Sequence, residues 1–422
     1  MLTFTASAFG SVPGQSRAGG AAGWTLLSLS ALAGCVTPPP ATPTPVPPTP
    51  IIVTMPTVSD VARRLADTLR TVLDGAVRDS AFPGAVAVVG TSARTLATIG
   101  AGHLDWAEAT VPDEHTLWDL ASLTKVVGTT SAMIQLVADR RVELDAPVQR
   151  YLPSWRVPGA ERVTIRHLLL HTSGLRAHRP LYTETSDATA ARALVYATPL
   201  DTVPGARTVY SDLGIILLGD VIERVTGERL EDHLKRTVFG PLGMTETMYR
   251  PPASLLPRIA PTEIDPWRGR HIRGEVHDEN AFRLGGVAPH AGLFSSAHDL
   301  ARFARMYLNN GRLDSVQVLD SATIALFTRV ADKSFSTRAL GWDTPDGRNS
   351  AGTLMSDRAF GHTGFTGTSI WIDPSADVFV LLLTNRVNPS RANMRIAGVR
   401  RAVADAAMSV MRSLPPSSSS PP

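Results

Sequence analysis

Ser122 and Lys125 are the residues whose types and spacing point most directly to chemistry. They stand in residues 117–133, LWDLASLTKVVGTTSAM, where an apolar helical pattern begins at Ser122. A spacing of three places two side chains on the same face of a helix. A neutral amine beside a serine hydroxyl can accept its proton and make the alcohol a nucleophile. The pair therefore predicts nucleophilic catalysis by serine.

The choice of lysine supports this interpretation. Only three of the 41 basic residues are lysines, namely Lys125, Lys235 and Lys333. Lysine and arginine carry the same charge, but only lysine readily loses its proton when it is desolvated. Apolar surroundings and a helix N-terminus both favour the neutral amine. We therefore expect Lys125 to act as a neutral amine; the alternative is a surface lysine beside an N-cap serine.

Two other stretches are weaker candidates for a site. His167 and His171, in HLLLH, are four residues apart, which suits zinc on a helix, but no glutamate stands between them and no third ligand is identifiable. The stretch VHDENA, residues 276–281, either lines a substrate site or forms a solvated loop. No G-x-S-x-G motif occurs, so the triad of an α/β-hydrolase is not supported. We expect no metal and no cofactor.

The N-terminal segment has the pattern of a targeting sequence. Residues 21–33, AAGWTLLSLSALA, form an apolar run that suits a signal-peptide core and is too short to span a bilayer. The run continues into Leu-Ala-Gly-Cys, and Cys35 is the only cysteine of the chain. This ending resembles a bacterial lipobox, whose cysteine becomes the lipidated N-terminus; the alternative is an ordinary secretory signal. We predict a lipoprotein signal peptide over residues 1–34.

The segments beside the folded part are rich in proline. Residues 36–50, VTPPPATPTPVPPTP, have no apolar period and favour extended polyproline II. Residues 35–56 are therefore predicted to be a lipidated cysteine and a stalk that holds the protein to a bacterial envelope membrane. Residues 413–422, SLPPSSSSPP, are predicted to be a disordered tail. The folded domain is expected over residues 57–412, in the periplasm or on the cell surface.

Composition limits the range of partners. The chain is 43% hydrophobic and 19% charged, with a formal charge of +3, as in ordinary globular proteins. Basic residues do not cluster with interleaved aromatic residues, so we expect no nucleic-acid binding. No required protein partner is evident.

The periodicity predicts strands at both ends of the folded part. Apolar residues recur at helical spacing over residues 61–77, and a further helix is expected at about 391–412. Two β-branched hairpins are expected between these helices, with strands at 84–90 and 94–100, and at 367–373 and 377–385. The long central portion reads as helices and loops broken by proline or glycine. We predict an α+β fold: an antiparallel sheet built from N- and C-terminal strands, flanked by helices, with an inserted, mainly helical region.

Three motifs in a fixed order carry a family resemblance. They are SLTK at 122–125, YSDLGIILLGDVIERVTG from Tyr210, and GHTGFTG at 361–367. Together they resemble the serine-hydrolase superfamily of class C β-lactamases, DD-peptidases and related esterases, and S-x-x-K is a signature of penicillin-recognising enzymes. The likeness covers about residues 80–411. The stretch from VHDEN to LGGVAPHAGLF is similar to members described as D-alanyl-D-alanine carboxypeptidases.

The resemblance implies a role for each matching residue. Ser122 would be the nucleophile that forms an acyl-enzyme, with Lys125 as its proton acceptor or electrostatic partner. Tyr210 would shuttle protons between nucleophile and leaving group. The backbone N–H groups of Ser122 and Phe365 would form the oxyanion hole. The implied activity is hydrolysis of D-alanyl peptides of the cell wall, with an esterase, a weak β-lactamase or a non-catalytic peptidoglycan-binding homologue as alternatives.

Two positions depart from the usual family pattern. Asp212 stands where many members have asparagine, and His362, followed by Thr363 and Gly364, stands where many have lysine. All four positions are implied to bind substrate. A histidine is only partly cationic at neutral pH, and Asp212 adds a negative charge. We therefore expect weaker recognition of carboxylate-bearing substrates than in the family at large.

Overall fold

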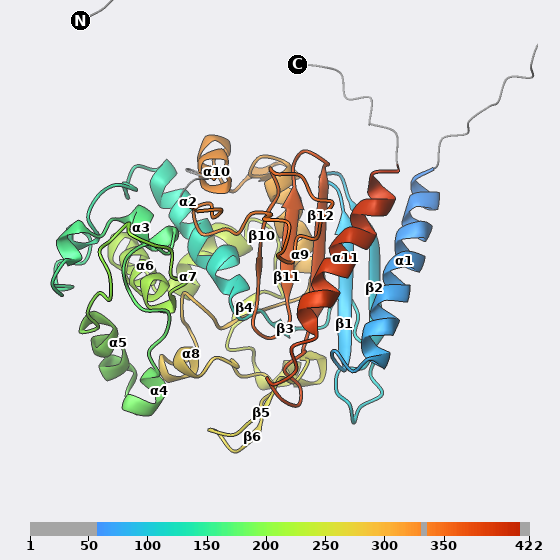
Figure 1. The fold of residues 1–422 in the computed structure, drawn as a ribbon, viewed down its shortest axis with the longest axis horizontal. Helices are drawn as coiled ribbons and strands as arrows, with labels where there is room; N and C mark the ends of the chain where they lie inside the picture. Colours follow the sequence, from blue (N-terminus) through green and yellow to red (C-terminus); the bar gives the residue numbers. More distant parts are fainter. Residues whose placement is uncertain (1–56, 331–335, 414–422) are drawn as a thin grey trace, which may run out of the picture. The chain divides into compact units, whose positions relative to one another are not determined.

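The computed structural model describes residues 57–330 and 336–413. The predicted signal peptide, Cys35, the stalk and the tail beyond Ser413 lie outside the described residues. Figure 1 shows the described part as a sheet covered by helices, with a mostly helical region beside it.

The first helix, α1 (Val58–Arg78), forms where the apolar spacing predicts it. Thr57 and Asp60 make a capping box, in which each side chain accepts a hydrogen bond from the other residue's backbone N–H. One stripe of the helix is buried, including Leu65, Leu69 and Leu73. This stripe faces the sheet, so α1 is held by its apolar face.

The main sheet joins the two ends of the domain. Its strands run in the order β10-β11-β12-β1-β2, and all neighbours are antiparallel. Their bounds are Phe360–Thr363 for β10, Ser369–Asp373 for β11, Val378–Thr384 for β12, Gly84–Gly90 for β1 and Thr95–Gly102 for β2. The predicted α+β fold and both predicted hairpins are confirmed.

The two faces of the sheet belong to two apolar cores. On β1, Val86 and Val88 pack into one core, whereas Ala87 and Val89 pack into the other, as the two-residue period of a strand requires. Helices α1 and α11 (Ile396–Met411) cover one face, and α9 (Ala297–Leu308) packs against the other (Figure 1). The sheet is buried on both sides and forms a rigid wall for the site.

The remaining elements build the helical region and its connections. The longer helices are α2 (Ser131–Ala138), α5 (Ala188–Tyr196), α6 (Asp212–Thr226) and α10 (Ser321–Thr328). The short helices are α3 (Ile165–Leu169), α4 (Leu181–Glu184), α7 (Leu230–Leu234) and α8 (Glu279–Arg283). The short strands are β3 (Trp118–Asp119), β4 (Met248–Tyr249), β5 (Ile264–Asp265), β6 (Arg270–His271), β7 (Leu293–Ser295), β8 (Arg312–Leu313) and β9 (Val316–Gln317). None of the helices in the described ranges is both long and apolar enough to cross a membrane.

One local expectation is corrected. The helix predicted from Ser122 begins as a widened π-helical turn, Lys125–Thr130, and becomes a regular α-helix only at Ser131. Polar side chains bond outside the usual ladder here: Thr129 Oγ1 donates to Pro289 O at 2.6 Å, and Ser131 Oγ donates to Val126 O. Such widened turns are frequent at functional sites.

Candidate active site

Ser122, the candidate nucleophile, stands on a tight turn between β3 and the π-helical segment. Ala121, just before Ser122, has a positive φ of 45°, which is unusual for a residue other than glycine. Asp119 holds this backbone, because its carboxylate accepts hydrogen bonds from Ala121 N at 2.8 Å and His277 N at 2.6 Å. Thr366 Oγ1 also donates to Asp119 O at 2.7 Å, which ties the turn to the chain after β10. Strain of this kind, held by surrounding bonds, is typical of a reactive position.

Lys125 reaches Ser122 directly. Its Nζ donates to Ser122 Oγ at 3.0 Å and to His290 O at 2.9 Å, and it lies 2.8 Å from Asp212 Oδ1. The side chain is only 2% exposed. The predicted pairing of Ser122 with Lys125 is therefore present, with Asp212 as an additional partner.

The structure corrects the expected charge of Lys125. Burial lowers the pKa of the amine, as the sequence suggested, but the nearby Asp212 carboxylate and Tyr210 raise it, and the net shift is upward. Opposite charges at contact distance outweigh desolvation here. Lys125 is thus an ammonium in the ligand-free protein and not the neutral amine that we expected.

The same contact gives Asp212 a partner that the sequence did not indicate. Its carboxylate forms an ion pair with Lys125, and its predicted contact with substrate stays a prediction. The Oδ1 atom receives no well-aligned hydrogen bond from any residue in the described ranges. Coulomb attraction depends on distance more than on angle, so the 2.8 Å contact still joins the two charges.

Tyr210 lies beside this pair, as predicted. Lys125 Nζ is 5.0 Å from the centre of its ring, and both Lys125 and Ser122 act on its hydroxyl by lowering the pKa of the phenol. The residue is 37% exposed, so one side of the ring faces solvent. Burial of the phenol group raises the pKa of Tyr210 although Lys125 opposes the shift. The hydroxyl is therefore protonated at neutral pH and can donate a proton.

His362 is not the partly charged group that the sequence suggested. It lies on β10, is 2% exposed, and its Nδ1 lies 2.9 Å from the carbonyl oxygen of Thr363, to which it donates. Burial lowers the pKa of His362 to about 4, with Arg338 and Lys125 acting in the same direction against Asp343. The imidazole is neutral and provides no cation for a substrate.

The predicted oxyanion donors have free N–H groups. Among the described residues, neither Ser122 N nor Phe365 N donates to another backbone group. Gly364 allows the close approach of the two segments, because a Cβ there would lie 2.3 Å from Leu120 O. Phe365 is 48% exposed, so its backbone stands at the mouth of the site. The arrangement suits two donors aimed at one developing oxyanion.

Arg338 is a member of this group of side chains that the sequence did not indicate. Its Cζ lies 5.5 Å from the centre of the Tyr210 ring, and Nη1 forms an ion pair with Asp343. The side chain is 14% exposed, and Nε and Nη2 are buried without a hydrogen-bond partner among the described residues. No local signal marks this arginine, because only the fold brings it to Tyr210.

His171 also belongs to the site and not to a zinc centre. Its ring packs 4.5 Å from that of Tyr210, and its Nδ1 accepts a hydrogen bond from Ser211 N at 3.0 Å. Burial holds the pKa of His171 well below its usual value, so the ring is neutral. His167 instead caps α3 by accepting from Thr164 N. Over residues 57–330 and 336–413, no three His, Cys, Asp or Glu side chains gather as a possible metal site.

The VHDEN stretch is a buried support of the site and not a solvated loop. The His277 ring stacks on Phe365 at 5.7 Å, and its Nε2 lies 2.8 Å from Glu263. Asp278 pairs with His290 at 3.1 Å, and the carbonyl of His290 accepts from Lys125. The stretch therefore contacts both the segment of Phe365 and, through His290, the side chain of Lys125.

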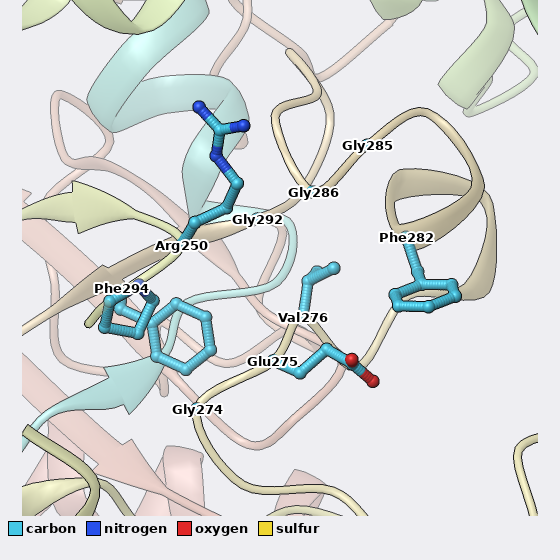
Figure 2. Close-up of a pocket in the computed structure, with 10 residues that line it drawn as sticks. Arg250, Gly274, Glu275, Val276, Phe282, Gly285, Gly286, Gly292 and Phe294 are labelled. Carbon is cyan, nitrogen blue, oxygen red and sulfur yellow. The ribbon is translucent and has the colours of Figure 1, made fainter. Parts of the chain in front are cut away.

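A cavity of about 440 Å³ lies on this stretch, apart from the catalytic group. Arg250, Glu275, Val276 and Phe282 are among its lining residues, with Arg250 and Phe282 on opposite sides (Figure 2). Neither Ser122, Lys125 nor Tyr210 lines it. This cavity therefore does not contain the candidate catalytic side chains.

Comparison with known proteins decides the family. Residues 66–404 match the family described as Beta-lactamase. The chain belongs to the β-lactamase family. A Salmonella typhi protein named "Putative D-alanyl-D-alanine carboxypeptidase" is 32% identical over 314 residues, covering 67% of this chain and 72% of that protein. A Salmonella paratyphi B protein of the same name matches equally. The resemblance seen in the motifs is confirmed, and the protein is a serine hydrolase of this family.

Solved structures show the same fold. A penicillin-binding protein homologue from Caulobacter crescentus has a TM-score of 0.67 and 20% identity, covering 82% of this chain and 97% of that one. EstCE1, described as a hydrolase with promiscuous acyltransferase activity, has a TM-score of 0.66 and 22% identity, covering 81% of this chain and 99% of that one. At these identities the likeness establishes the fold alone.

Proposed function

We propose that this protein forms an acyl-enzyme on Ser122 and acts as a carboxypeptidase on D-alanyl peptides of the cell wall. The observation that carries the proposal is the group of Ser122, Lys125 and Tyr210, with Ser122 Oγ 3.0 Å from the buried Nζ of Lys125. A serine held in this way can attack a carbonyl carbon. The N–H groups of Ser122 and Phe365 would stabilise the oxyanion, and Tyr210 would protonate the leaving group.

Arg338 supports a substrate that ends in a carboxylate. The Nε and Nη2 atoms form the edge of a guanidinium that binds a carboxylate through two parallel hydrogen bonds. Both atoms lack a partner among the described residues, and an unpaired buried cationic donor is unfavourable. A turn of this side chain toward the cleft would offer that edge to the terminal carboxylate of a D-alanyl peptide. This cation compensates for the neutral His362.

An esterase acting on neutral substrates is the second candidate. His362 is neutral and Asp212 is paired with Lys125, so neither side chain gives the site a preference for a carboxylate. The family relatives named as carboxypeptidases favour the first candidate. The fold, shared with a hydrolase described as having promiscuous acyltransferase activity, is compatible with the second. Non-catalytic peptidoglycan binding is the third, and the intact Ser122–Lys125 contact speaks against it.

A substrate panel tests these candidates. The wild type and Arg338→Gln would be compared on a D-Ala-D-Ala peptide, a neutral p-nitrophenyl ester and a chromogenic cephalosporin. We expect the peptide to be cleaved, and the variant to lose about tenfold or more in kcat/KM on the two carboxylate-bearing substrates but not on the ester. Ester hydrolysis without peptide cleavage would favour the esterase. Failure of a fluorophosphonate to label Ser122 would favour the binding protein.

We also propose that the protein is exported and anchored by lipid on Cys35. The apolar run, the Leu-Ala-Gly-Cys ending and the proline-rich stalk support this location. It would place the enzyme in the bacterial envelope, where peptidoglycan peptides are available.

A further inference from the structure

Lys125 Nζ donates hydrogen bonds to Ser122 Oγ at 3.0 Å and to His290 O at 2.9 Å. The same nitrogen lies 2.8 Å from Asp212 Oδ1, with which it forms an ion pair. Asp212 is the first residue of α6, where a helix N-terminus favours a negative charge. Its Oδ1 is buried and receives no well-aligned hydrogen bond from any described residue, so a lone pair remains to take up a proton. This geometry joins Asp212 to Ser122 through a single atom, Lys125 Nζ.

We propose that Asp212 holds the proton that leaves Ser122 during acylation, and that Lys125 passes this proton on. The inference rests on the proposed acyl transfer at Ser122. Lys125 gives one proton to Asp212 Oδ1, and its freed lone pair takes the proton from Ser122 Oγ. The Oγ then bonds to the substrate carbonyl carbon, and the carbonyl π pair moves onto oxygen.

Charge balances across this step. At its start Lys125 is positive and Asp212 negative; at its end Lys125 is again positive, Asp212 is neutral and the substrate oxygen is negative. When the tetrahedral intermediate collapses, the bond to the leaving group breaks. The stored proton returns through Lys125 and Tyr210 to that group, which leaves neutral.

Among the titratable groups around Ser122 and Lys125, Asp212 fits best as the acceptor of the Ser122 proton. Tyr210 is a protonated phenol, because burial raises its pKa. The carboxylate of Asp278 is already paired with His290. The other charged or titratable groups facing the site are the imidazoles of His171 and His362 and the guanidinium of Arg338. None of these three is bonded to Lys125 or Ser122 in the described structure.

The proposal explains how the Ser122 hydroxyl can lose its proton although the neighbouring Lys125 is an ammonium. The ion pair with Asp212 and the upward pKa shift of Lys125 favour the ammonium over a free amine in the resting protein. The Lys125–Asp212 pair needs no free amine, because the final acceptor of the Ser122 proton is the carboxylate of Asp212. The negative charge of Asp212 is also matched by Lys125, so it does not repel a carboxylate-bearing substrate.

The pH dependence of Ser122 phosphonylation tests the relay, because attack on a fluorophosphonate requires the same loss of the Oγ proton as acylation and releases fluoride. The wild type, Asp212→Asn and Asp212→Glu would react with a fluorophosphonate between pH 5 and 10, with Ser122 labelling followed by intact mass. We expect Asp212→Asn to lose about 100-fold in rate at pH 6 and to recover toward alkaline pH, because acylation then requires neutral Lys125. The acid limb of the profile, which is the pH range over which the labelling rate falls as the pH is lowered, should lie more than one pH unit higher in Asp212→Asn than in the wild type. Asp212→Glu should keep the limb of the wild type.

A matched control lies on the same helix. Asp220 is a buried carboxylate of α6 paired with Arg192 at 3.0 Å, about 12 Å further along the helix axis. Asp220→Asn should leave the position of the acid limb unchanged. If Asp212→Asn does not fold, Asp212→Ser, which suits a helix start, takes its place.

A direct measurement follows the proton on Lys125. Because the chain has only three lysines, the Cε signal of Lys125 can be assigned in protein labelled with ¹³C-lysine. It should report an ammonium up to pH 10 in the wild type and titrate at lower pH in Asp212→Asn. If Asp212→Asn keeps the acid limb of the labelling rate and the Lys125 titration of the wild type, the relay is overturned and Asp212 returns to substrate binding. A wild type that is not acylated at any pH would overturn the proposed function itself.

Discussion

Replacing Lys125 by arginine separates the charge of this residue from its ability to transfer a proton. The ammonium fills a site that is 2% exposed and is held by three oxygens within 3.0 Å. An arginine keeps the ion pair with Asp212 but cannot give up its proton, since its pKa is too high. We therefore expect Lys125→Arg to lose nearly all activity on every substrate.

The size of this loss can be set from the contacts. Proton transfer by a positioned group contributes about 10²- to 10⁴-fold, or about 3–5 kcal/mol in activation free energy. The larger guanidinium must also fit the buried site, which costs about 1–3 kcal/mol of stability. The activity loss should therefore exceed the stability loss and remain in protein that is fully folded.

The assay combines turnover with urea unfolding. Ser122→Ala, Lys125→Arg and the double variant would be compared, and we expect the double variant to be scarcely worse than either single one, because the two groups act as a unit. Lys235→Arg, at an exposed lysine, is the matched control and should retain full activity. Near-normal turnover by Lys125→Arg would refute proton transfer through Lys125 and leave it only an electrostatic role.

Three further predictions follow from other parts of the structure. His362 has a pKa of about 4 in the folded protein against 6.5 when exposed, so the unfolded chain binds more protons between these values. Stability should be full above about pH 6.5 and fall by about 3 kcal/mol as the pH drops to 4, and His362→Asn should flatten this slope in urea unfolding. An equal slope in both proteins would contradict the neutral buried imidazole. Gly364→Ala places a Cβ 2.1 Å from Thr368 Oγ1 and should lower the unfolding free energy by about 2–3 kcal/mol. Gly398→Ala, in α11 with open space around it, is the control and should stabilise the protein slightly. Equal effects of the two substitutions on the unfolding free energy would exclude the steric explanation. Cys35→Ser should abolish lipid attachment and membrane fractionation, and a variant processed and localised like the wild type would disprove the lipoprotein assignment.

The sequence by itself determined the elements and the identity of the central residues. The two-residue period of β1 and β12 and the helical stripe of α1 are local patterns, so the α+β arrangement could be inferred before the fold was seen. The spacing of Ser122 and Lys125 is also local, because three residues of a turn are enough to bring them together. The order of the motifs then indicated the family.

Only the tertiary structure decided the charges of the site. A pKa depends on burial and on neighbours that are distant in sequence, and the desolvation argument for Lys125 lacked its strongest neighbour, Asp212. Arg338 and His171 likewise reach Tyr210 through packing that no local pattern encodes. The residue types at the site could therefore be read from the chain, whereas their protonation and their partners arise from contacts that exist only when the chain has folded.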